Sequence, residues 1–221
     1  MVNIRNFAAL WLCAVLLSAC QSAYYNALEE FGYHKRDLLV SRVKAAQDSQ
    51  QAVKEQFQSA LQAFKSAVDF NGGELEERYD TLNAEYESSE MRAQEVSDRI
   101  DAVESVAEAL FDEWSGELDE YNNPELRADS ERELQATEQR YEQLMAAMRR
   151  AEDSMQPVLE VFQDQVLALK HNLNTRAISA LADERTTVEA NVASLVADME
   201  AAIKEAQTFL ATVDNKTNSG R

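Results

Sequence analysis

Glycine and proline are scarce in this chain of 221 residues, which contains five Gly and two Pro. These residues mark turns and interrupt regular structure, so the chain has few natural places to reverse its direction. Ala, Glu, Gln, Leu, Val and Ser dominate instead. This composition favours long helices.

Cysteine and histidine are also rare, with two of each. His34 and His171 are far apart in the sequence, and neither has a Glu three residues before it, so the Glu-x-x-His motifs of di-iron bundles are missing. Nucleophile-elbow, phosphate-loop, dinucleotide-binding and HExxH motifs are missing as well. We therefore expect no catalytic residue, no metal ligand and no cofactor, and a metal-binding bundle enzyme is the least favoured alternative.

Basic residues are few, because 21 Lys and Arg stand against 40 Asp and Glu and give a net charge of −19. A phosphate-binding surface needs a patch of Lys and Arg, so we expect no nucleic-acid partner. The negative charge also opposes direct attraction to anionic lipid head groups, and it keeps the helical faces soluble.

Residues 1–19 form an apolar leader with a single charge, Arg5. Its apolar run over residues 7–17 has the length of a signal-peptide core and is too short to span a bilayer as a helix. The leader ends in Leu-Ser-Ala-Cys at residues 17–20, which resembles the bacterial lipobox of an aliphatic residue, two small residues and cysteine. The alternative is an ordinary secretory signal followed by a chance cysteine.

The resemblance to the lipobox implies that a diacylglycerol is attached to the sulfur of Cys20, that the chain is cleaved after Ala19, and that the new amine is acylated. Several acyl chains on one residue anchor a protein firmly. In Gram-negative lipoproteins the following residue biases sorting, and Gln21 is not the Asp associated with retention in the inner membrane. The resemblance therefore implies an outer-membrane lipoprotein that faces the periplasm, with Cys20 as its membrane contact.

Apolar residues recur at helical spacing in the rest of the chain, and breakers divide it into segments. A first helix is expected over residues 24–70, ended by Asn-Gly-Gly at 71–73. A loop over 115–124 precedes the third helix, with Asn123 as its N-cap and Pro124 at its first position. The stripe of the first helix is Val43, Ala46, Gln50, Val53, Phe57, Ala60, Phe64 and Ala67.

The second helix, over residues 75–114, carries a strict heptad repeat that is typical of coiled coils. The short turn before it makes the first two helices antiparallel neighbours. Its heptad positions are Leu75, Leu82, Ser89, Val96, Val103 and Leu110, and, four residues after each, Tyr79, Tyr86, Ala93, Ile100, Ala107 and Trp114.

Pro157 lies inside the stripe of the third helix, and because the stripe continues past it we expect a kink. A reversal at 172–175 or at 182–184 then lets the last stripe, which ends at Val213, pack against the others. We predict an all-α fold, an elongated antiparallel bundle or coiled coil of three to four long helices. It fills residues 27–213, after a lipidated tether over 20–26 and before a flexible polar tail over 214–221.

The late chain has more polar variety than a coiled coil needs. We expect an interaction surface there, and the alternative is a bundle core with ordinary polar flanks. Residues 155–182, MQPVLEVFQDQVLALKHNLNTRAISALA, resemble an uncharacterised group of Gram-negative coiled-coil lipoproteins, which implies one helical domain but no activity and no site residues. The candidate interaction residues are Gln165, Lys170, His171, Asn172 and Asn174.

We therefore expect a lipid-anchored, non-enzymatic coiled-coil protein that scaffolds or regulates an envelope protein partner. The acidic faces suit a basic partner. The alternative is a periplasmic chaperone or transport adaptor, which requires an exposed apolar groove. A heptad stripe serves an intramolecular bundle and a homo-oligomer equally well, so both stay open.

Overall fold

The regular structure in the described part of the chain is helical throughout. The computed structural model describes residues 34–69, 75–171 and 175–219. No strand occurs among these residues, so the predicted all-α class is confirmed. The elements are α2 (Lys35–Val68), α3 (Leu75–Glu117), the short 3₁₀-helix η1 (Leu118–Glu120), α4 (Pro124–Asp153), α5 (Met155–His171) and α6 (Thr175–Ser219).

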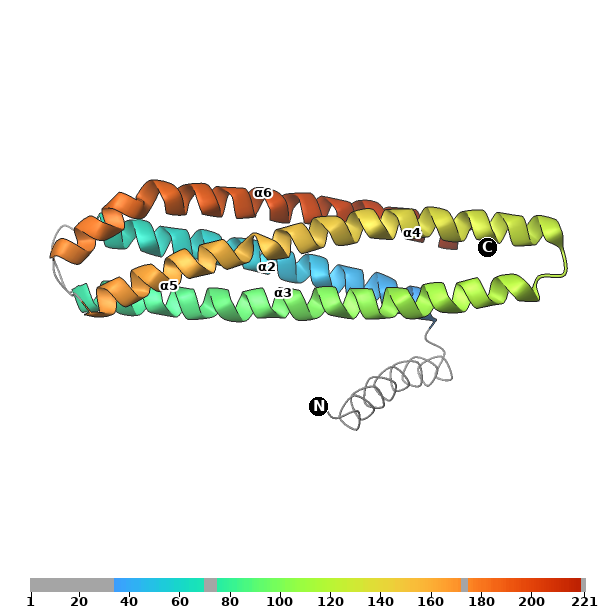
Figure 1. The fold of residues 1–221 in the computed structure, drawn as a ribbon, viewed down its shortest axis with the longest axis horizontal. Helices are drawn as coiled ribbons and strands as arrows, with labels where there is room; N and C mark the ends of the chain where they lie inside the picture. Colours follow the sequence, from blue (N-terminus) through green and yellow to red (C-terminus); the bar gives the residue numbers. More distant parts are fainter. Residues whose placement is uncertain (1–33, 70–74, 172–174, 220–221) are drawn as a thin grey trace, which may run out of the picture.

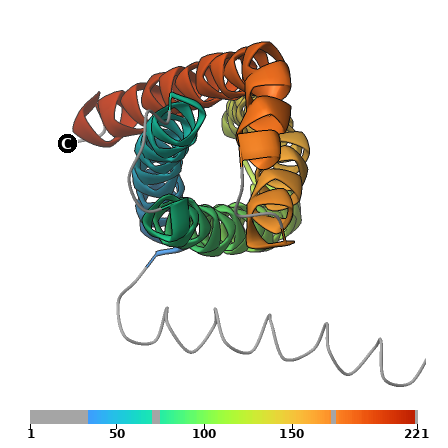
Figure 2. The ribbon, with the colours of Figure 1, turned by 90° about the vertical axis from the view of Figure 1, so that its left-hand side faces the viewer.

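The helices form an elongated bundle of four rods (Figure 1). α4 and α5 follow each other in nearly the same direction and act as one rod beside α2, α3 and α6. Each rod packs against two neighbours, in the order α2, α3, α4–α5, α6 and back to α2, and Figure 2 shows this ring in end view. Rods that follow each other in the chain run antiparallel, which confirms the predicted elongated antiparallel bundle.

The predicted apolar stripes face the bundle core. On α2, all the predicted stripe positions from Val43 to Ala67 are buried. On α3, every heptad position from Leu75 to Trp114 is buried or half-buried, and Val106, outside the heptad, is buried too. Each rod of the ring faces two neighbours, so its buried face is wider than the two-position seam of a coiled coil.

The kink predicted at Pro157 takes the form of a one-residue interruption at Ser154, between α4 and α5. Pro157 has no N–H to donate to the carbonyl of Asp153, and its ring crowds that carbonyl, so the regular α-helical bonds stop there. The Ser154 N–H still donates to the carbonyl four residues earlier at 3.1 Å. The buried stripe continues through Met155 and Val158, which keeps the two helices in one rod.

The start of α4 agrees with the prediction. Asn123 caps the helix, since its Oδ1 accepts the N–H of Glu125 at 2.9 Å, and Pro124 occupies the first helical position. The missing N–H of Pro124 costs nothing there, because the first N–H groups of a helix have no partner within it.

The last reversal lies between His171 and Thr175, the first of the two predicted places, while residues 182–184 lie inside α6. The end of α6 differs from our prediction, because the helix continues to Ser219 although we expected it to end near residue 213. Residues 214–219 contain neither Gly nor Pro, and polar residues lower helix stability only modestly. The predicted leader, tether and Asn-Gly-Gly turn lie outside the described residues.

The rods differ in length at one end of the bundle. The corner formed by α3, η1 and α4 extends beyond the start of α2 and beyond the end of α6 (Figure 1). The four-rod core therefore stops before this corner, and the inner faces of α3 and α4 lose the cover of α2 and α6. This end of the four-rod core holds the pocket described next.

Candidate functional site

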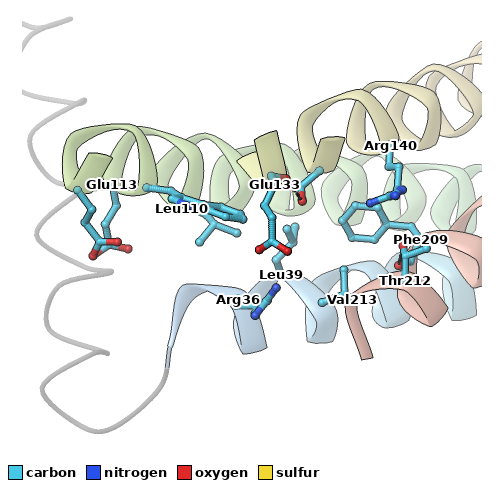
Figure 3. Close-up of a pocket in the computed structure, with 12 residues that line it drawn as sticks. Arg36, Leu39, Leu110, Glu113, Glu133, Arg140, Phe209, Thr212 and Val213 are labelled. Carbon is cyan, nitrogen blue, oxygen red and sulfur yellow. Dashed lines mark hydrogen bonds between the residues drawn. The ribbon is translucent and has the colours of Figure 1, made fainter. Parts of the chain in front are cut away.

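A pocket of about 220 Å³ lies where α2 begins and α6 nears its end (Figure 3). We call it the end pocket. All four rods contribute to it, so it exists only in the assembled bundle. Its lining residues are Arg36 and Leu39 from α2, Leu110, Glu113, Trp114 and Glu117 from α3, Glu133, Thr137 and Arg140 from α4, and Phe209, Thr212 and Val213 from α6.

The apolar part of the end pocket comes from three helices. Leu39, Phe209 and Val213 are buried core residues, and Leu110 is half-buried on the last turns of α3. Figure 3 shows these four side chains projecting into the space between the helices. Together they give the pocket an apolar floor that continues the core of the bundle.

Trp114 forms a further part of the wall and is held in place by a hydrogen bond. Its Nε1–H donates to Oγ of Ser130 at 2.8 Å, which joins α3 to α4. A buried tryptophan usually finds such a partner for its N–H while its ring contributes apolar surface. The indole is thus a fixed wall of the pocket.

An ion pair involves one of the lining residues of the end pocket, Glu113. Nζ of Lys35 lies 3.0 Å from Oε1 of Glu113, and the Lys35 side chain is 5% exposed. This pair joins the first turn of α2 to α3. Because Lys35 offsets the charge of Glu113, that carboxylate adds little net negative charge to the pocket.

Two arginines also line the pocket. Within the part of the chain that the structure describes, neither Arg36 nor Arg140 makes an ion pair or a hydrogen bond through its guanidinium. Arg36 and Glu133 point toward each other in the view of Figure 3, whereas Arg140 lies at the end opposite Glu113. The two arginines therefore differ in their surroundings, with a carboxylate facing Arg36 only.

Tyr141 follows Arg140 on α4 and packs between α3 and α4. Its ring meets that of Phe111 edge to face, with the centroids 5.3 Å apart. Burial, followed by the charges of Glu104 and Glu108, raises the pKa of Tyr141 to about 12. The phenol therefore stays neutral at physiological pH and serves packing.

The strongest charge cluster of the described residues is an ion-pair clamp outside the pocket. Arg149 on α4 contacts Asp101 at 2.8 Å on α3, as well as Glu104, and it contacts Glu152 at 2.9 Å on its own helix. Burial opposes the charge of Arg149, but hydrogen bonds to these three carboxylates outweigh it and raise its pKa. The cluster joins α3 to α4 through the ion pairs of Arg149 with Asp101 and Glu104.

The polar side chains of the end pocket are those of Glu, Thr and Arg, with Trp114. Its lining has no histidine, cysteine, serine or aspartate, and the hydroxyls of Thr137 and Thr212 donate to carbonyls of their own helices. Across residues 34–69, 75–171 and 175–219, no group of three or more His, Cys, Asp or Glu is placed to hold a metal ion. Nor does any described helix have the length and apolarity that a membrane span needs.

The residues chosen from the sequence do not form one exposed surface. Lys170 and His171 are exposed at the end of α5, but Gln165 is buried, with 8% exposed. Gln165 follows Phe162 by three residues and precedes Leu169 by four, so it occupies a core position of the helix. Cys20, Asn172 and Asn174 lie outside the described residues.

The exposed residues Lys170 and His171 at the end of α5 and the end pocket are at opposite ends of the bundle (Figure 1).

The end pocket was not predicted from the sequence. Leu110, Trp114 and Val213 stood on predicted stripes, but no signal in the sequence places them together. Leu39 and Phe209 were not recognised as core residues at all.

Gln50 is the most unusual buried residue of the core. It is fully buried, and neither its amide nitrogen nor its amide oxygen has a hydrogen-bond partner among the described residues. The buried hydroxyls of Ser49 and Ser89, in contrast, donate to carbonyls of their own helices, at 2.9 and 2.7 Å. A buried amide without partners lowers stability, so Gln50 is a point of weakness in the core.

Comparison with known proteins gives a family but no named relative. No curated protein matches the chain. A family model described as "Protein of unknown function (DUF2959)" matches residues 24–213. The match takes in the described bundle from its first helix to Val213 on α6. Since it covers far more than half of the chain, the protein belongs to this family.

Proposed function

We propose that the protein is a lipid-anchored, non-enzymatic coiled-coil protein of the periplasm that scaffolds or regulates a partner at the outer membrane. The lipobox at residues 17–20, which ends in Cys20, is the observation that carries this proposal. Gln21 in the next position supports sorting to the outer membrane, as in the lipoproteins that this segment resembles.

The small number of residues between Cys20 and the start of α2 supports a short tether. Only residues 21–34 separate Cys20 from the start of α2. A fully extended segment of this length spans at most about 50 Å. An anchor at Cys20 therefore holds the α2 end of the bundle, which contains the end pocket, near the membrane surface.

The surface of the bundle favours a scaffolding role for the protein over a chaperone role. The exposed large apolar residues of the described ranges are few: Met91 on α3, Leu167 on α5, and Tyr121 and Leu126 near the start of α4. Holding an unfolded client needs a continuous apolar face of several hundred Å², and such scattered residues do not provide one. The acidic helix faces instead suit a folded partner with basic residues.

The proposed lipid anchor is tested by replacing Cys20, whose sulfur would carry the lipid. In a Gram-negative host, Cys20→Ala should abolish incorporation of radiolabelled palmitate and release the protein from the outer-membrane fraction. Cys13→Ala is the matched control, because Cys13 lies in the leader and its loss should leave both readouts unchanged. Unaltered fractionation of the Cys20→Ala protein, or processing that is insensitive to globomycin, would refute the anchor.

The scaffolding role is tested by crosslinking in the cell. A photo-crosslinking amino acid at Lys170 or His171 should capture one defined envelope protein, because both positions are exposed at one end of the bundle. The same amino acid at Met91, which is exposed in the middle of α3, should not capture it. Capture of many different unfolded proteins at all three positions would instead indicate a chaperone.

A further inference from the structure

We propose that the end pocket binds a single-chain anionic amphiphile, with the apolar chain on the floor of the pocket and the carboxylate or phosphate head on Arg140. This inference goes beyond the proposed function and does not depend on the anchor at Cys20. It depends on the volume of the pocket, on its apolar floor and on the surroundings of one arginine.

The floor suits an alkyl chain. Leu39, Leu110, Phe209 and Val213 come from three helices and line the same pocket (Figure 3). Burial of each methylene group of a ligand is favourable through the hydrophobic effect. A short alkyl chain therefore gains substantial binding energy here, whereas a small polar ion does not.

Arg140 is the cation best placed to hold the head. The residues three and four positions before and after it are Ala136, Thr137, Gln143 and Leu144, so no carboxylate lies next to it on its helix. It also has no ion-pair partner among the described residues, although the chain has 40 acidic side chains. A guanidinium left without a carboxylate at the edge of an apolar pocket is a favourable site for an incoming anion.

Other arginines of α4 show that this arrangement is not the rule for the helix. Arg127 pairs with Asp119 at 2.7 Å, Arg132 pairs with Asp129, and Arg149 contacts three carboxylates. Arg150 also has no ion-pair partner in the described ranges, but it is exposed and does not line the pocket. Arg140 alone on α4 combines an unpaired guanidinium with a place in the pocket wall, within the described residues.

The carboxylates of the lining favour this orientation of the ligand. Glu113 and Glu117 are one helical turn apart, so they share one face of α3, and Glu113 lies at the opposite end of the pocket from Arg140 in Figure 3. Glu133 points toward Arg36 in the same view, so Arg36 is the less favourable anion site. An anionic head is therefore attracted to the Arg140 end. At the other end Glu117 repels it, since Lys35 offsets the charge of Glu113 only.

The experiment is a titration of the full chain with dodecanoate below its micelle concentration. The chain should carry Trp11→Phe, which leaves Trp114 in the pocket wall as its sole tryptophan. We expect a saturable change in Trp114 fluorescence and one site by calorimetry. Dodecyl phosphate should bind as well, and the ratio of the two affinities tells which head the site prefers. Acetate and inorganic phosphate lack the alkyl chain of these ligands and should not bind.

Two variants test where the head and the alkyl chain of the ligand bind in the pocket. Arg140→Gln should weaken dodecanoate binding about tenfold or more, since a charge-assisted hydrogen bond is lost, and Arg140→Lys should restore part of the affinity. Thr212→Trp fills the pocket from a half-buried position and should abolish binding. This variant is measured by calorimetry, because it adds a second tryptophan. Arg78→Gln, on an exposed part of α3 that does not line the pocket, is the charge-matched control and should bind as the parent chain does.

Three results would overturn the proposal. The first is the absence of saturable binding. The second is equal affinity of the Arg140→Gln and parent chains for dodecanoate. The third is equal affinity of the parent chain for dodecanoate and for dodecyltrimethylammonium, which would show that the charge of the head is not recognised. Circular dichroism of each variant establishes that a loss of binding is not a loss of fold.

Discussion

Nζ of Lys35 lies 3.0 Å from Oε1 of Glu113, so the first residue of α2 is fixed to the last turns of α3. The two side chains are 5% and 34% exposed, whereas those of Arg132 and Asp129, a pair on the surface of α4, are 74% and 61% exposed. Surface ion pairs contribute about 0–1 kcal/mol, and shielded pairs cost more to break because one charge is left without its partner. The pair thus secures the end of the bundle that holds the pocket.

Replacing Lys35 with methionine keeps most of the apolar stem and removes the charge. We expect the free energy of unfolding to fall by about 1 kcal/mol, because Glu113 loses its partner but keeps some contact with water. Urea denaturation followed by circular dichroism measures this change. Lys44→Met is the matched control on an exposed position of the same helix and should have almost no effect. Equal effects of the two substitutions would show that the ion pair contributes nothing.

The amide of Gln50 should make the bundle less stable than an apolar side chain would. Gln50→Leu replaces it with a side chain of similar size and removes two buried polar atoms that lack partners. We expect the free energy of unfolding to rise by about 1–3 kcal/mol. Gln62→Leu, at an exposed position of α2, is the control and should be nearly neutral. A loss of stability in Gln50→Leu would mean that the amide holds a buried water or fixes the register of the helices.

Phe162 fills the centre of the core. Its ring is 6.4 Å from that of Phe57, with 17° between the planes, and 6.4 Å from that of Phe64. Phe162→Ala should lower the free energy of unfolding by about 3–5 kcal/mol, because it leaves a cavity that the rods cannot close. Leu167→Ala, at an exposed position of the same helix, should cost far less.

A double-mutant cycle of Phe57→Ala and Phe162→Ala tests the contact between the two rings themselves. We expect a coupling energy of about 0.5–1.5 kcal/mol, as for other aromatic pairs. Because α2 and α5 belong to rods on opposite corners of the ring, this coupling also reports that the bundle has formed. Additive single effects would contradict the direct contact.

The sequence predicts most of the helical architecture, because helical periodicity is a local property. The stripe of α2 from Val43 to Ala67 is buried at every predicted position, and the cap at Asn123 lies where the residue types require it. Gln165 shows the limit of this reasoning. Its polar side chain predicts a surface position, but its spacing from Phe162 places it in the core. In a helix, the spacing from other core residues has more influence on burial than the residue type.

The end pocket could not be predicted because it depends on the lengths and the register of four rods. Leu39 and Phe209 are 170 positions apart in the sequence, yet both line it. Whether Arg140 meets a carboxylate depends on which residues of the neighbouring rods reach its level. The sequence fixes the neighbours of Arg140 on its own helix only, so its unpaired state appears only once the bundle is assembled.

Tyr141 should make stability depend on pH in the alkaline range. Burial, and then the charges of Glu104 and Glu108, raises its pKa from 10.0 to about 12. Between these values the unfolded chain releases the phenolic proton while the folded chain keeps it, so the free energy of unfolding falls as the pH rises. Tyr141→Phe removes this proton and should make the free energy of unfolding fall less between about pH 9 and about pH 11. Urea denaturation at the two pH values measures this difference. Tyr121→Phe, at an exposed position, should leave the fall as in the parent chain. If Tyr141→Phe and the parent chain lose equal stability over this range, the phenol of Tyr141 is not the group that titrates.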